Sequence, residues 1–153
     1  MHFSTLALTA TAALTPLVHA VGNAIVHNNC AQPIYVWSVG SAVGPENTVN
    51  PGAEYSELFH SDPSSGGIAI KITRTENGLY DGSAQTDFAY SLDGNNIWYD
   101  LSDVFGDPFS GTSVVVAPSD TSCGTIDWSN GIPPSGSQVK VCESGTNLTL
   151  TTC

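Results

Sequence analysis

The sequence predicts an all-β domain, most simply a two-sheet β-sandwich of about nine or ten short strands. Three observations lead to this fold class. Apolar and polar residues alternate in several short segments, and dipeptides typical of tight turns separate these segments. No window keeps an apolar period of 3.6 residues over three helical turns.

The N-terminal residues, 1–20, are expected to be a secretory signal peptide. They contain no Asp, Glu, Lys or Arg, and Thr and Pro interrupt an apolar stretch too short to span a bilayer. Val18-His19-Ala20 predicts cleavage before Val21, which leaves one mature domain, 21–153. A cut before His19 would expose an N-terminal histidine suited to copper chelation, but it would leave Val18 where a small residue is required.

Two segments alternate strictly, as half-buried strands do. In residues 66–74 (GGIAIKITR) the isoleucines share one face, and in 85–92 (QTDFAYSL) Thr86, Phe88, Tyr90 and Leu92 share another. Both faces of 34–39 are apolar, so this strand is expected to lie centrally in its sheet, covered on both sides. Further strands are expected at 24–26, 53–59, 97–101, 113–117, 138–142 and 148–152.

Turn dipeptides fall between these segments, where Gly or Asn tolerates the positive φ that a tight turn requires. The residues 130–138 (NGIPPSGSQ) read as a long loop. The turns are expected at Pro51-Gly52, Asn77-Gly78, Asp81-Gly82, Asp93-Gly94 and Asn130-Gly131.

Four cysteines in the mature chain predict two disulfides, since secretion exposes them to an oxidising compartment. They are Cys30, Cys123, Cys142 and Cys153, and sequence alone leaves three connectivities open. A Cys30–Cys153 bond would require the first and last strands to be neighbours and would contribute about 4 to 5 kcal/mol. A Cys123–Cys142 bond would contribute about 3 kcal/mol.

The chain is strongly acidic, with fourteen Asp and Glu against three Lys and Arg and a net charge of -11. Nucleic acid and anionic membranes are therefore poor partners, because phosphate binding needs clustered basic residues. No second apolar segment is long enough to cross a membrane. Asn147-Leu148-Thr149 is an N-glycosylation acceptor in a secreted chain.

Five segments of the chain carry a resemblance to known proteins: AIVHNNCAQPIYVWSVG, NPGAEYSELF, SGGIAIKITRT, TDFAYSLDGNNIWYDLSDVFGDPF and NLTLTTC. They resemble, in the same order, the segments that frame thaumatin-like proteins. The resemblance is closer still to a small fungal branch, the Blastomyces yeast-phase-specific protein family, often labelled antigenic thaumatin-like proteins. It implies a thaumatin-like β-sandwich in which the first and last cysteines are bonded.

Larger thaumatin-like proteins have many more cysteines and a second region that forms one wall of an acidic cleft. That cleft is associated with β-1,3-glucan binding and, in some members, with weak glucanase activity. This chain has four cysteines and no room for the second region, so the wall is expected to be missing or much reduced. By resemblance, Lys71 or Arg74 stands for the cleft arginine, and the cleft acids correspond to Asp87, Asp100 and either Asp103 or Asp107.

Asp87 and Asp100 are the candidate catalytic residues for an enzymatic alternative. Glycoside hydrolysis needs two carboxylates about 5 to 9.5 Å apart, and these two lie on adjacent predicted strands joined by the turn at Asp93-Gly94. A chain this rich in acids will place some pair at that distance by chance. Hydrolysis is therefore the alternative interpretation rather than the main one.

Other site chemistries find little support. His27 and His60 are isolated and lack metal-ligand spacing, and no Gly-x-Ser-x-Gly elbow is present. No metal or other cofactor is expected. Calcium is a weaker possibility, because the nearby oxygen ligands lack the spacing of a known calcium loop. Those ligands are Asp93, Asn95, Asp100 and Asp103.

A binding role fits better, because large rings can stack on sugars or anchor a protein partner. Trp37 is expected in the core, while Trp98 and Tyr99 are adjacent in a strand, so they face opposite sides and at least one is expected to be exposed. We expect residues 95–109 to form an exposed recognition surface with Trp98, Tyr99, Asp103 and Asp107 as binding residues. The large rings are Tyr35, Trp37, Trp98, Tyr99 and Trp128.

The sequence therefore predicts a monomeric, extracellular or cell-wall protein. Its expected role is non-enzymatic binding of cell-wall glycan or of a surface protein on a host or neighbouring cell. A weak β-1,3-glucan hydrolase or antifungal protein is the first alternative, and a structural wall component without a specific ligand is the second.

Overall fold

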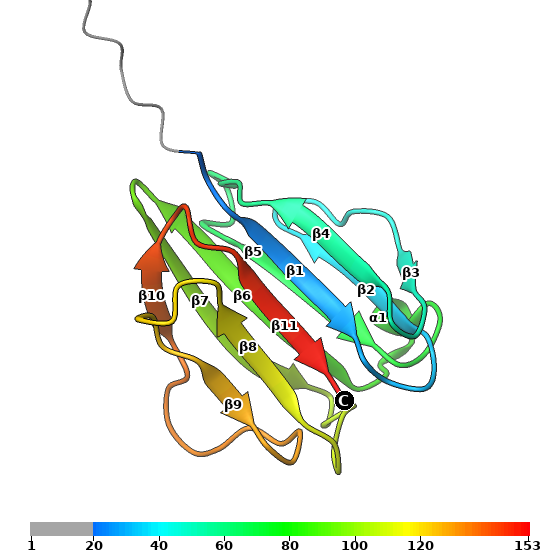
Figure 1. Cartoon of the computed structure of the whole chain (residues 1–153). Coiled ribbons are helices and arrows are strands. Elements are labelled where there is room, and N and C mark those ends of the chain that lie inside the picture. The colour runs from blue at the N-terminus through cyan, green and yellow to red at the C-terminus, as the bar shows by residue number, and fades with distance from the viewer. Residues whose placement is uncertain (1–19) are drawn as a thin grey trace, which may run out of the picture.

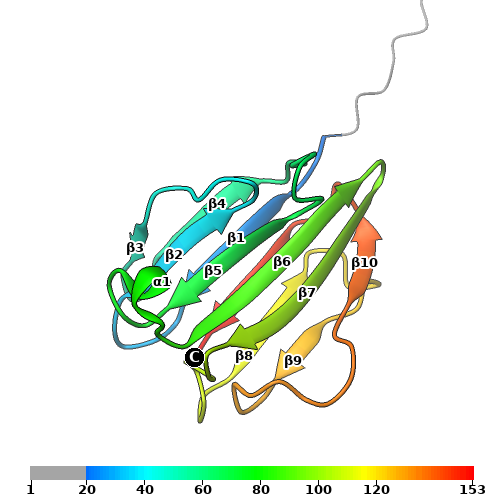
Figure 2. The same ribbon diagram turned by 180° about the vertical axis from the view of Figure 1, so that it is seen from behind.

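The structure is a two-sheet β-sandwich, as the sequence predicts. It is a computed structural model that describes residues 20–153, so the predicted signal peptide lies outside the described residues except for Ala20. Figure 1 shows the two sheets stacked face to face. Figure 2 shows the molecule turned by 180°, with the second sheet, which contains β5 (Ile68–Thr73), β6 (Gln85–Asp93) and β7 (Asn96–Val104), towards the viewer.

The first sheet has five strands in the order β4-β1-β11-β8-β9. All neighbours are antiparallel except β1 and β11, which run parallel. Its strands are β1 (Asn23–Asn28), β4 (Glu54–Leu58), β8 (Val114–Pro118), β9 (Ile126–Trp128) and β11 (Leu148–Thr152).

The second sheet has six antiparallel strands in the order β10-β7-β6-β5-β2-β3. Its longest pair is the β6–β7 hairpin, in which Asp93 pairs with Asn96 across the predicted turn. Its strands are β2 (Ile34–Val39), β3 (Asn47–Val49), β5 (Ile68–Thr73), β6 (Gln85–Asp93), β7 (Asn96–Val104) and β10 (Lys140–Glu143).

The two ends of the chain are joined side by side. β1 pairs with β11, and Cys30 at the end of β1 is bonded to Cys153 after β11, with 4.9 Å between their Cα atoms. The second bond, Cys123–Cys142, ties the β8–β9 connection of one sheet to β10 of the other. The bond that the resemblance implies is therefore present, together with the contact between the terminal strands that it requires.

The core lies between the sheets and is made of the inward-facing side chain of each alternating strand. From the six-stranded sheet it receives the isoleucines of β5 together with Phe88 and Tyr90 of β6. Trp128 of β9 and Leu148 and Leu150 of β11 come from the facing sheet, and all of these are at most 4% exposed.

β2 does not lie in the centre of its sheet, so that prediction is wrong. It pairs with β5 on one side and with the three-residue β3, an edge strand, on the other. Its outer face is apolar because Trp37 is covered locally: the ring of Tyr80, in the one-turn helix α1 (Gly78–Asp81), meets it edge-on at 6.5 Å between centroids. Trp37 is buried, as expected.

A polar cluster joins the sheets along the edge at β4. Glu57 of β4 accepts hydrogen bonds from the hydroxyls of Tyr55 and Tyr90, each at 2.6 Å. Burial and the neighbouring Glu57 carboxylate raise the pKa of both tyrosines. Both hydroxyls therefore remain protonated donors at physiological pH, and the carboxylate bridges β4 to β6.

Candidate functional site

The outer face of the six-stranded sheet carries a row of small side chains. The register pairs Val39 with Ala69, Ala69 with Ala89, and Ala89 with Asp100. Directly paired residues of an antiparallel sheet project from the same face. One row of the outer face therefore crosses β2, β5, β6 and β7 and contains two adjacent alanines.

Two open hollows adjoin at Ala89. They measure about 440 Å³ and about 160 Å³, Ala89, Tyr90 and Ser91 line both, and together they are here called the outer groove. The lining residues are Val39, Gly40, Ser65, Gly66, Gly67, Ile68, Ala69, Ala89, Tyr90, Ser91, Trp98, Tyr99, Asp100 and Val139.

The floor of the outer groove is low because its side chains are small. Alanine methyl groups stand between larger neighbours, and the loop before β5 approaches β6 closely at Gly67, where a Cβ would strike Tyr90 and Ser91. Asp62 fixes the same loop against the residues after β2, because its Oδ2 accepts 2.6 Å hydrogen bonds from the amide and hydroxyl of Ser41. These hydrogen bonds lower the pKa of Asp62, so the carboxylate stays ionised.

Trp98 forms one wall of the outer groove. It pairs with Ser91 on one side and Val141 on the other, and 44% of the residue is exposed. Its neighbour Tyr99 points into the core, is 1% exposed, and donates its hydroxyl hydrogen to the carbonyl of Gly124. The two rings face opposite sides as predicted, and Trp98 is the one that reaches the surface.

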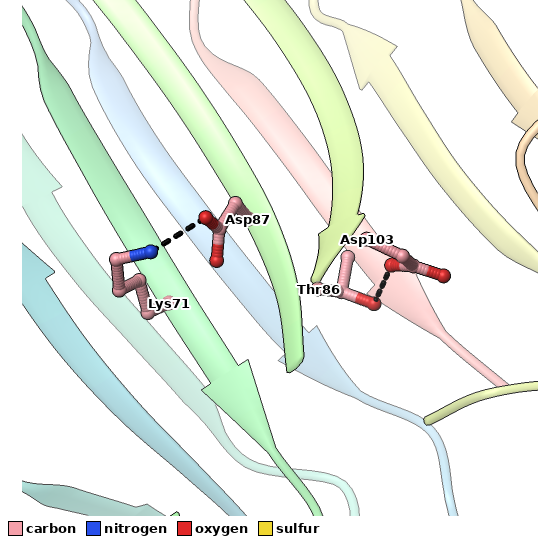
Figure 3. Close-up of polar contacts among 4 residues, drawn as sticks. All are labelled: Lys71, Thr86, Asp87 and Asp103. Carbon is pink, nitrogen blue, oxygen red and sulfur yellow. Dashed lines mark hydrogen bonds and ion pairs between the residues drawn. The ribbon is translucent and has the colours of Figure 1, made fainter. Parts of the chain in front are cut away.

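An ion pair lies beside the row of alanines, on the same outer face of the sheet. Lys71 Nζ of β5 lies 2.6 Å from Asp87 Oδ2 of β6, and both side chains are largely buried (Figure 3). Burial raises the pKa of Asp87, while the Lys71 ammonium opposes this shift. Asp87 Oδ1 is buried without a hydrogen-bond partner. Of the two residues proposed for the cleft cation, Lys71 is the one paired with Asp87, and Arg74 lies over the ring of Phe109.

The candidate catalytic residues, Asp87 and Asp100, lie on the same face of the sheet but are not directly paired across β6 and β7. Asp87 pairs with Ser102 and Asp100 with Ala89, so the two carboxylates are diagonal neighbours on β6 and β7. Diagonal neighbours lie about 7 to 8 Å apart at Cα. A glycosidase pair needs its carboxyl groups about 5 to 9.5 Å apart, which side chains of diagonal neighbours on one face can reach. Asp100 Oδ1 accepts a 2.8 Å hydrogen bond from the amide of Leu101.

Asp103 projects from the opposite face of β7. It pairs with Thr86, whose hydroxyl donates a 2.5 Å hydrogen bond to Asp103 Oδ1 (Figure 3). Burial raises the pKa of Asp103 to about 7, with a further contribution from the nearby Asp107 carboxyl. Residues 95–109 thus do not present one recognition surface: Trp98 is on the outer face, Tyr99 is in the core, and Asp103 and Asp107 lie towards the far end of β7.

The oxygen ligands suggested for calcium are not brought together. Asp93 ends β6, Asp100 faces outward and Asp103 faces inward, because three positions along a strand reverse the face. Among the described residues, one group has metal-ligand spacing, Asp120 with Cys123 and Cys142. Its two sulfurs are bonded to each other, so they are not free thiolate ligands.

His27 and His60 each lie beside a polar neighbour. His27 Nδ1 of β1 lies 3.2 Å from Glu54 Oε1 of β4. His60 Nδ1 lies 3.0 Å from the Tyr90 hydroxyl at the edge of the inter-sheet polar cluster. Sequence reasoning missed this cluster, although Tyr55 and Glu57 alternate along β4 and therefore had to share a face.

The side chain of Asn147, the predicted glycosylation acceptor, is hydrogen-bonded to the first residue of β1. Asn147 Oδ1 accepts hydrogen bonds from the backbone and side-chain nitrogens of Asn23, at 2.9 and 3.3 Å. A glycan would be attached through Nδ2, the other end of the amide, so these contacts leave the attachment atom available. None of the helices in the described part of the chain has the length and apolar content needed to span a membrane.

Solved structures with a similar fold include two proteins of known type. The protein elicitor MoHrip2 from Magnaporthe oryzae matches with a TM-score of 0.71 and 27% identity, covering 86% of this chain and 98% of that one. The thaumatin-like xylanase inhibitor TLXI matches with a TM-score of 0.56 and 14% identity, covering 85% and 98% of the two chains. At 14% identity the second match supports the fold alone.

Curated relatives agree with the fold. An antigenic thaumatin-like protein of Arthroderma benhamiae is 34% identical over 138 residues, covering 86% of this chain and 69% of the relative. The secreted thaumatin-like protein calA of Emericella nidulans is 30% identical over 141 residues, covering 85% and 80%. The family model of the Blastomyces yeast-phase-specific protein matches residues 11–153. The chain therefore belongs to the Blastomyces yeast-phase-specific protein family, a fungal group of thaumatin-like proteins.

Proposed function

We propose that this protein is a non-enzymatic, extracellular binding protein whose outer groove binds a cell-wall glycan. The observation that carries the proposal is the exposed Trp98 ring on the wall of a groove floored by Ala69 and Ala89. A tryptophan face offers a flat apolar surface to a sugar ring, and a low floor allows a polymer to lie across the sheet.

The dimensions of the groove favour an extended ligand. The groove crosses the sheet from Val139, beside β10, to Val39 of β2, which is a distance of four strand intervals. At about 4.8 Å per interval, its length is roughly 19 Å. The names of the relatives, secreted and antigenic thaumatin-like proteins, support a location outside the cell. A ligand in the wall fits both the location and the open, linear shape of the site.

The first experiment measures co-sedimentation of the purified, oxidised protein with insoluble β-1,3-glucan and with chitin. We expect saturable loss of protein from solution on at least one polymer, and Trp98→Ala should weaken it roughly tenfold because one stacking contact is lost. Phe105→Ala is the matched control, since Phe105 is also an exposed ring but does not line the groove. Equal effects of the two substitutions would contradict the proposal.

A protein on a host or neighbouring cell is the competing ligand. The similar elicitor of Magnaporthe oryzae and the antigenic relative of Arthroderma benhamiae support this alternative by what their names describe. Absence of binding to either polymer, together with Trp98-dependent binding to intact cells stripped of wall glycan, would favour it. If the protein is instead a structural wall component without a specific ligand, the Trp98→Ala substitution should change neither its association with the wall nor its stability.

Weak β-1,3-glucan hydrolysis remains the enzymatic alternative, because Asp87 and Asp100 share the outer face and burial raises the pKa of Asp87. A general acid needs such a raised pKa, and a second carboxylate must remain ionised nearby. Release of reducing ends from soluble β-1,3-glucan would support hydrolysis only if the Asp87→Asn, Asp100→Asn double variant abolished it. No release by the unaltered protein would exclude it.

A further inference from the structure

We infer that the Trp98 end of the outer groove selects glycans that carry free, protonated amino groups, such as partly deacetylated chitin. This inference rests on the proposed glycan-binding function and names the chemical class of the ligand. It follows from the charges that the sheet register places on either side of the Trp98 ring.

Two carboxylates lie on the same face of the sheet as the Trp98 ring, one towards each end of β7. Asp100 lies two residues after Trp98 on β7 and therefore on the same face, where it lines the groove. Asn96 lies two residues before Trp98 and pairs with Glu143 of β10, so that side chain is on the same face too. Glu143 is exposed and also lines a separate hollow of about 210 Å³ with Asn95.

The basic residues of the chain do not compensate these acids. There are three Lys and Arg in all, of which two have other partners and the third faces away. Lys71 is paired with Asp87, and Arg74 lies 5.9 Å from the ring centroid of Phe109. Lys140 pairs with Tyr99, so it projects from the opposite face of β10.

This arrangement suits a cation that is attached to a flat sugar ring. An ammonium group is attracted both by nearby carboxylates and by the face of a tryptophan, whereas an N-acetyl group carries no charge. An anionic polysaccharide would meet like charge here, on a protein with a net charge of -11. The hollow beside Trp98 is open and only about 160 Å³, which fits a polymer lying across it better than a deeply inserted lysine or arginine side chain.

The experiment compares two soluble probes by calorimetric titration: a hexasaccharide of N-acetylglucosamine and the same hexasaccharide with every acetyl group removed. We expect the deacetylated probe to bind roughly tenfold more tightly at mildly acidic pH, because charge-assisted contacts replace neutral ones. Trp98→Ala, Asp100→Asn and Glu143→Gln should each weaken its binding several-fold. Asp100→Asn retains the oxygen that accepts from Leu101, so it should fold normally.

Asp127→Asn is the charge-matched control, because Asp127 is exposed on β9 in the other sheet. An equal loss with this variant would mean unspecific attraction of a cationic polymer to an acidic protein, and the inference would be wrong. Equal affinity for the two hexasaccharides, still dependent on Trp98, would overturn the inference but leave the proposed function intact. Trp98-dependent binding of oligolysine without binding of either sugar would overturn both in favour of a basic protein partner.

Discussion

Asp87 and Asp103 occupy neighbouring strands of one sheet but face opposite sides of it. Both are removed from solvent, and burial raises the pKa of each carboxyl. Asp87, on the outer face, has the Lys71 ammonium 2.6 Å from one oxygen. Asp103, on the inner face, has the hydroxyl of Thr86 at 2.5 Å and a second acid, Asp107, nearby.

The difference shows how the partner of a buried acid decides its charge. A cation favours the ionised form, so Asp87 and Lys71 form a compensated pair that itself adds little net charge to the outer face. A hydroxyl favours ionisation only weakly, and a second carboxyl opposes it, so Asp103 gains a proton close to neutrality. Lys71 therefore limits the rise in the pKa of Asp87, whereas the Asp107 carboxyl adds to the rise in the pKa of Asp103, whose charge changes close to neutral pH.

The largest expected effect comes from removing the cation. Lys71→Met leaves Asp87 buried without compensation and should lower the free energy of unfolding by about 2 to 3 kcal/mol at neutral pH, somewhat less than for a fully buried pair. The loss should shrink in acid, where Asp87 can accept a proton. Chemical denaturation at neutral and acidic pH measures both quantities.

The matched control is the double variant Lys71→Met, Asp87→Asn, which removes the unpaired charge as well. It should recover most of the lost stability, because the cost comes from the uncompensated carboxylate rather than from the missing ammonium. A single variant as stable as the unaltered protein would show instead that the pair behaves like an exposed salt bridge.

A smaller loss is expected from removing the hydroxyl on the inner face. Thr86→Val leaves Asp103 Oδ1 without its donor and should destabilise the protein by about 1 to 2 kcal/mol at neutral pH. The same change should raise the pKa of Asp103 further, which the carboxyl chemical shift of Asp103 in an NMR titration would report. A downward shift of that pKa would contradict the assigned role of Thr86.

Much of the fold could be predicted because two simple signals governed it. Alternation in residues 66–74 and 85–92 identified the central strands β5 and β6. The bond between the first and last cysteines, which the resemblance implied, required the contact of β1 with β11. The strands β3 and β9 were missed because three residues are too few to show a period. The position of β2 was misjudged because the single turn α1, which covers Trp37, leaves no helical periodicity.

The candidate site was less predictable, since it depends on which face each strand turns to solvent. Alternation established that Trp98 and Tyr99 oppose each other but could not say which one is buried. Val139 and the loop at Gly67 complete the groove from distant parts of the chain, and no local pattern connects them to Trp98. The separation of Asp100 from Asp103 was accessible in principle, because an odd spacing along a strand places two residues on opposite faces.

The smallest expected effect is a change in pH dependence. The pKa of Asp103 rises from 3.8 to about 7 on folding, so the folded state binds the proton more tightly than the unfolded one. Stability should therefore increase as the pH falls from about 7 towards about 4. Asp103→Asn keeps an acceptor for Thr86 but cannot ionise. We expect it to be more stable than the unaltered protein at neutral pH by on the order of 1 kcal/mol, after allowance for solvent screening.

The pH profile of the Asp103→Asn variant should also be shallower, though not flat, because Asp87 titrates in the same direction. Denaturation midpoints measured across this pH range compare the two profiles, with Asp127→Asn as a control for the loss of one exposed acid. Parallel profiles for the Asp103→Asn variant and the unaltered protein would show that Asp103 stays ionised in the folded state. In that case the contrast between Asp87, which is paired with a cation, and Asp103, which titrates close to neutral pH, would no longer hold.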